Sequence, residues 1–161
     1  PIALAQARSE TRRMARVALE MVDETLAFLK DNDLKRLPAL EKKEVLTDAL
    51  QKEITNFLVS LSQKSITQES SQEVASMMHM VNDLERVGDY CENLWLLSQR
   101  KLDQKITFSA IAMNEIAEIS EVTRSFLARI VKALEEKDLE VYAEAQRLED
   151  AIDWAQSGRL R

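Results

Sequence analysis

Three pairs of acidic residues share the spacing Glu-x-x-x-Asp. In an α-helix, residues i and i+4 lie on one face, so each pair would present two carboxylates side by side. Like charges at this spacing destabilise a helix by a few tenths of a kcal/mol, so helix stability alone does not favour them. Paired carboxylates instead suit a hard, oxygen-preferring metal ion. The pairs are Glu44 with Asp48, Glu85 with Asp89, and Glu149 with Asp153.

The position of the pairs around their helices predicts that two of them meet. At about 100° per residue, each pair lies about 80 to 120° from the centre of its helix's apolar stripe, in the same rotational sense. Glu92 extends the second set by one turn, and Gly88 inside it costs about 1 kcal/mol relative to Ala, which suggests close approach of a neighbouring helix or ligand. Four converging carboxylates would need a cation to stay ionised. The alternative is that these are ordinary exposed acids, unconnected in space.

The elements that must position these residues are helices. The chain has 161 residues, 45% of them apolar and 31% charged, with only two Gly and two Pro, too little turn chemistry for a sheet protein. Apolar residues recur at intervals of three and four. Pro38 suits a helix start, and Ser70 with Glu73 resembles a capping box at the start of the third helix. The predicted helices cover about residues 3–30, 38–63, 70–101, 107–136 and 138–158.

The chain also contains an internal sequence similarity. Leu29 aligns with Leu134, Asp33 with Asp138, and the first acidic pair with the third. The first two helices therefore look repeated as the fourth and fifth, and a copy of the third helix is missing. Two helical hairpins of similar length can also match by chance.

The run Asp83-Leu84-Glu85-Arg86-Val87-Gly88-Asp89 resembles the signature of PhoU-domain proteins, the phosphate-uptake regulators. The resemblance implies an all-α fold of antiparallel, up-down helices: a full three-helix bundle over residues 1–103, followed by a truncated second bundle of two helices over residues 104–161. It also implies a non-enzymatic regulator that acts with phosphate transport or signalling proteins. Some family members hold multinuclear iron or other divalent or trivalent metal clusters on such motifs. Here the implied ligands are Glu44, Asp48, Glu85 and Asp89, with Glu92, Glu149 and Asp153 as further candidates.

The start of the chain adds a second resemblance. Pro1-Ile2-Ala3-Leu4, followed by Glu10 and Arg13-Met14-Ala15, is similar to the cytoplasmic PhoU-like tail of bacterial sodium-dependent phosphate cotransporters. This implies a cytoplasmic location, as part of an inner-membrane protein with the transporter's membrane domain as partner. A cluster of arginines fits the basic bias next to a membrane span, although such a cluster taken alone is more often a solvated basic helix face: Arg8, Arg12, Arg13 and Arg16.

Other function classes find little support. A net charge of −6 argues against a nucleic-acid partner. One histidine, His79, and one cysteine, Cys91, give no basis for a catalytic triad or a ferritin-like di-iron site, so we name no catalytic and no organic-cofactor residues. The alternative function is a metal-free structural bundle that oligomerises, and a metal-dependent hydrolase ranks last because no general base can be named.

Overall fold

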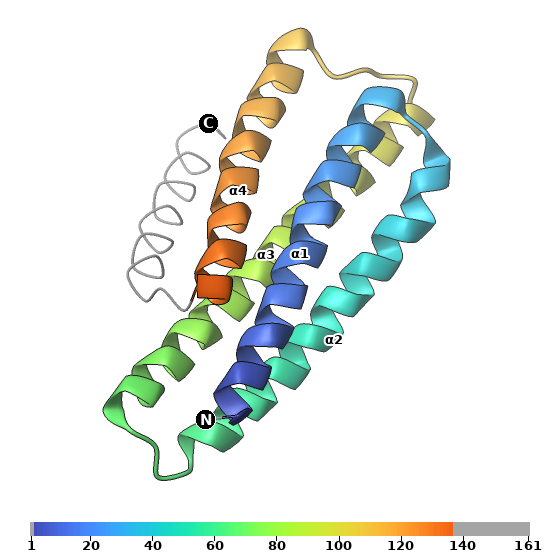
Figure 1. Ribbon diagram of the computed structural model, residues 1–161. Helices are drawn as coiled ribbons and strands as arrows, with labels where there is room; N and C mark the ends of the chain where they lie inside the picture. The colour runs from blue at the N-terminus through green and yellow to red at the C-terminus, as the bar shows by residue number, and fades with distance from the viewer. Residues whose placement is uncertain (1, 137–161) are drawn as a thin grey trace.

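The computed structural model describes residues 2–136, which form four α-helices and one short 3-10 helix (Figure 1). Successive α-helices run in opposite directions, and these residues contain no strand. The all-α fold predicted from apolar periodicity is therefore confirmed. The predicted fifth helix, at about 138–158, lies outside the described residues, and the division into residues 1–103 and 104–161 stays a prediction. The elements are α1 (Ile2–Asp31), η1 (Leu34–Arg36), α2 (Leu37–Ser62), α3 (Gln68–Asp103) and α4 (Ala110–Glu136).

Helix α1 is the centre of the bundle, because it packs against α2, α3 and α4. Its small buried residues, such as Ala15 and Ala18, allow neighbouring helices to approach it closely, while Met14, Met21 and Phe28 fill the space between them. Helices α2 and α3 also pack against each other, which completes a three-helix bundle. The acidic pairs of α2 and α3 are thus carried by adjacent helices.

Helix α4 lies along α1 and shares its apolar core through Phe126, Leu127, Ile130 and Leu134. Two ion pairs also join α1 and α4: Arg124 lies 2.7 Å from Asp23, and Arg16 lies 2.9 Å from Glu135. None of the described helices combines the length and the apolar content that crossing a membrane requires.

Asn32 and Asp33 form the turn between α1 and α2. Asn32 adopts a positive φ of 55°, a conformation that asparagine tolerates well, and its N–H donates to the carbonyl of Phe28 over 2.9 Å. The Asp33 carboxylate then accepts a hydrogen bond from the N–H of Lys35. Pro38 lies in the first turn of α2, as predicted.

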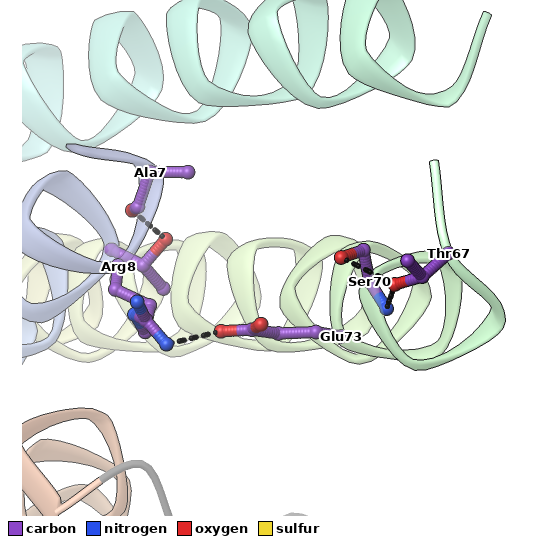
Figure 2. Close-up of polar contacts among 6 residues, drawn as sticks. Ala7, Arg8, Thr67, Ser70 and Glu73 are labelled. Carbon is purple, nitrogen blue, oxygen red and sulfur yellow. Dashed lines mark hydrogen bonds and ion pairs between the residues drawn. The ribbon is translucent and has the colours of Figure 1, made fainter. Parts of the chain in front are cut away.

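The predicted capping box at Ser70 and Glu73 is wrong. The N-cap of α3 is Thr67, which has an extended backbone and whose hydroxyl oxygen accepts from the N–H of Ser70 at 3.2 Å (Figure 2). Ser70 therefore lies inside the first turn. The carboxylate of Glu73 pairs instead with the Arg8 guanidinium of α1, 2.8 Å away, where both side chains are largely buried. Arg8 of α1 therefore binds the Glu73 carboxylate that the sequence pattern had predicted to cap α3.

Candidate metal centre

Helices α2 and α3 come close together at Gly88. This glycine is buried, and a Cβ added to it would lie 3.6 Å from Cγ2 of Thr47 and 3.7 Å from Cε of Met21. The close approach expected at Gly88 therefore exists and involves α2 as well as α1. Both distances are ordinary van der Waals contacts, so the space would accept a methyl group but not a longer side chain.

This contact brings the acidic pairs of the two helices together. Oxygen atoms of Glu44, Asp89 and Glu92 lie within 4.8 Å of one another, and so do oxygen atoms of Asp48, Glu85 and Asp89. Asp89 belongs to both groups. The five carboxylates form one cluster, here called the acidic cluster, in which α2 contributes two residues and α3 three.

Ionisation of the carboxyl groups in the acidic cluster is unfavourable in the free protein. Partial burial raises the pKa of the Glu44 carboxyl, and the charges of Asp48 and Glu92 raise it further. Partial burial also raises the pKa of Glu85, with further contributions from the charge of Asp89 and a hydrogen bond to it. The free protein therefore holds protons at these carboxyls more tightly than isolated glutamates do.

The basic residue next to Glu44 does not relieve this repulsion. Lys43 reaches towards α1, where its ammonium group lies 2.7 Å from Glu24 and 3.7 Å from Glu20. The positive charge of Arg86 lowers the pKa of Glu85, but this effect is smaller than each of the effects that raise it. A bound cation would compensate the cluster more directly.

The donor set fits a hard metal ion. Two oxygens bound to one such ion, each at about 2.0–2.6 Å, are at most about 4.0–5.2 Å apart. Oxygens within 4.8 Å of one another lie near the upper end of this range, so a small movement of the side chains would allow one ion to contact all three oxygens of a group. All the donors are carboxylates, which favours magnesium, calcium, manganese or iron over a thiophilic metal.

The remaining candidate residues lie elsewhere. His79 is exposed on α3 and belongs to neither carboxylate group. Cys91 is buried in the core, and burial raises the pKa of its thiol to about 11. Glu149 and Asp153 lie outside the described residues, so a second acidic site in this chain stays a prediction.

The fold and the acidic cluster define a class of helical protein in which two adjacent antiparallel helices of a bundle present carboxylates to each other. Residues 11–95, which span most of α1, all of α2 and most of α3, match the model of the PhoU domain. The chain therefore belongs to the PhoU domain family, and the resemblance identified from the run at Asp83 to Asp89 is confirmed.

A named relative agrees with this assignment. The chain is 25% identical, over 152 residues, to the phosphate-specific transport system accessory protein PhoU homolog of Clostridium acetobutylicum. The aligned part covers 93% of this chain and 68% of the relative. No solved structure gives a significant match. The similarity of the N-terminus to a cotransporter tail stays a prediction.

Proposed function

We propose that this protein is a non-enzymatic regulatory module of phosphate uptake. The observation that carries the proposal is the PhoU-domain match over residues 11–95. The name of the Clostridium relative, an accessory protein of a phosphate-specific transport system, points to the same process. The module would act by docking its helix surfaces onto a phosphate transporter or a signalling protein.

We further propose that the acidic cluster holds metal. Glu44 and Asp48 from α2 would bind together with Glu85, Asp89 and Glu92 from α3, and Asp89 would be shared between the two groups. The metal, iron or another divalent or trivalent ion, would supply positive charge that offsets the mutual repulsion of the carboxylates. These side chains would hold α2 against α3 and so fix the shape of the surface that a partner recognises.

The N-terminal resemblance supports a finer proposal, that this is the cytoplasmic module of a sodium-dependent phosphate transporter. The arginine cluster supports it less than the sequence suggested. Within the fold, Arg8 pairs with Glu73, Arg13 with Glu10, and Arg16 with Glu135. Ion pairs within the bundle therefore account for three of the four arginines, and the proposal rests on the resemblance of the first residues.

A phosphate-uptake assay tests the regulatory role. Cells that lack this protein should lose the normal difference in labelled-phosphate uptake between phosphate-rich and phosphate-poor medium, and the full-length protein should restore it. Uptake that responds normally to phosphate without the protein would contradict the proposal.

Elemental analysis of protein purified without chelator tests the metal separately. We expect a transition metal or calcium near stoichiometric amounts in the wild type and a large loss in a Glu85→Gln, Asp89→Asn double variant. The matched control is Glu53→Gln, which removes one exposed charge from α2 outside the cluster and should keep the metal. Less than about a tenth of an equivalent of any metal in the wild type would favour the metal-free structural bundle.

A further inference from the structure

A second site lies at the end of the bundle where α1 and α3 terminate. The connector from α3 to α4 crosses this end (Figure 1), and between it and the two helices lies a half-open pocket of about 290 Å³. This volume is at the lower end of ligand pockets, which begin at about 300 Å³. The last turns of α1 and α3, the connector and the first turn of α4 supply its walls: Leu29, Lys30, Asn32, Ser98, Lys101, Leu102, Ile106, Thr107, Phe108 and Met113.

The pocket combines positive charge with an apolar lining. Among the described residues that line it, Lys30 and Lys101 are the only ionisable ones, and none carries a carboxylate. Three acids directly adjoin lining residues along the chain, namely Asp31, Asp33 and Asp103; of these, Asp31 is engaged with Arg36 at 2.6 Å, and the hydrogen bond from Arg36 lowers the pKa of the Asp31 carboxyl. In a protein with a net charge of −6, two lysines that line one pocket give it a locally positive character.

Lys101 contacts an aromatic residue of the connector. Its ammonium nitrogen lies 3.7 Å from the centre of the Phe108 ring, so a cation–π contact holds the charge over one face of the connector's aromatic residue. A lysine in the last turn of a helix also complements the carbonyl end of that helix, but this role needs neither an aromatic partner nor a pocket.

An independent observation concerns Ser98. This residue lines the pocket and is 3% exposed, and its hydroxyl has no hydrogen-bond partner within the described residues. A buried hydroxyl without a partner costs about 1–3 kcal/mol, and native proteins rarely leave one unsatisfied. A ligand atom in the pocket would satisfy it once the hydroxyl, which is closed off from solvent here, turns towards the pocket.

We propose that this pocket binds a small organic anion. A carboxylate or phosphate group would interact with Lys30 and Lys101, and an apolar body of a few carbon atoms would lie against Ile106, Phe108 and Met113. The Ser98 hydroxyl would donate to an oxygen of the ligand. The pocket is lined by none of the cluster carboxylates, and the proposal does not depend on the proposed function.

NMR titration of the full chain tests the proposal. We use phenyl phosphate and hexanoate as probes for the two kinds of anion, with phenol, hexanol and inorganic phosphate as controls that lack one half of the ligand. At least one probe should give saturable amide shifts at Lys30, Ser98 and Thr107. Each control should bind at least about tenfold more weakly than its probe, which corresponds to about 1.4 kcal/mol. Repeating the titration after EDTA treatment should leave the affinity unchanged, because no metal is involved.

Variants separate the pocket from general surface binding. Lys30→Ala and Lys101→Ala should each weaken the better probe about fivefold or more, whereas Lys35→Ala, which removes an exposed lysine of η1 outside the pocket, should leave it unchanged. Ser98→Ala should weaken binding without unfolding the protein. The proposal is overturned if neither probe saturates, if a control binds as well as its probe, or if Lys35→Ala weakens binding as much as Lys101→Ala.

Discussion

Replacing Glu85 by glutamine should change the stability of the protein in opposite directions with and without metal. Glu85 has oxygens within 4.8 Å of those of Asp48 and Asp89. Two unit charges at this separation repel by about 0.9 kcal/mol at the dielectric constant of water, and by more where the site is partly buried. Because this repulsion and the partial burial of the carboxylate both oppose folding of the metal-free protein, we expect Glu85→Gln to stabilise it by about 1 kcal/mol at neutral pH.

In the presence of metal the same substitution removes a ligand, so the variant should gain less stability from added metal than the wild type does. Urea unfolding followed by circular dichroism, once with EDTA and once with excess Mn²⁺ or Fe²⁺, measures both effects. Glu53→Gln is the control and should behave like the wild type in both buffers. A Glu85→Gln variant that is less stable than the wild type in EDTA, or that responds to metal as the wild type does, would refute the reasoning.

Three further predictions concern the same helices. Because folding raises the pKa values of Glu44 and Glu85, the native state binds more protons than the unfolded state just above the ordinary glutamate pKa. As the pH falls from about 7 to 5, the metal-free wild type should therefore gain stability relative to the double variant Glu44→Gln, Glu85→Gln. Urea unfolding at each pH measures this, and an equal pH dependence of the two proteins would contradict it. Gly88→Ala should stabilise the protein by up to about 1 kcal/mol, because its methyl group makes ordinary contacts with its neighbours and alanine favours helix, whereas Gly88→Leu should destabilise it by about 1–3 kcal/mol in the same assay. Thr67→Ala should lower the free energy of unfolding by about 1 kcal/mol through loss of the α3 cap, and if Ser70→Ala cost more than Thr67→Ala, the assignment of the cap would be wrong.

The helices and the meeting of the acidic pairs could be predicted from the sequence, because both depend on local periodicity. Apolar residues at helical spacing give the rotation of each helix about its axis, and this rotation gives the side on which Glu44 and Glu85 lie. Gly88 marked the place of close approach. The structure adds that Thr47 is the residue of α2 that packs there, which periodicity alone does not identify.

What could not be predicted depends on contacts between distant residues. Ser70 and Glu73 have the spacing of a capping box, but Arg8, from a different helix, binds the Glu73 carboxylate, and Thr67 has the backbone conformation of a cap. The start of α4 was placed about three residues early, because Ser109, not Thr107, accepts the hydrogen bond from the first turn. The pocket at the end of the bundle depends on the path of the α3–α4 connector, which has no periodic signal.

The most direct test of the metal centre is an anomalous diffraction map from crystals of the full chain grown with Mn²⁺ or Fe²⁺. The account predicts an anomalous peak between α2 and α3, with carboxylate oxygens of Asp89 and at least two other cluster residues within about 2.0–2.6 Å of the ion. A map with no peak between these helices, in crystals that contain the metal, would contradict it.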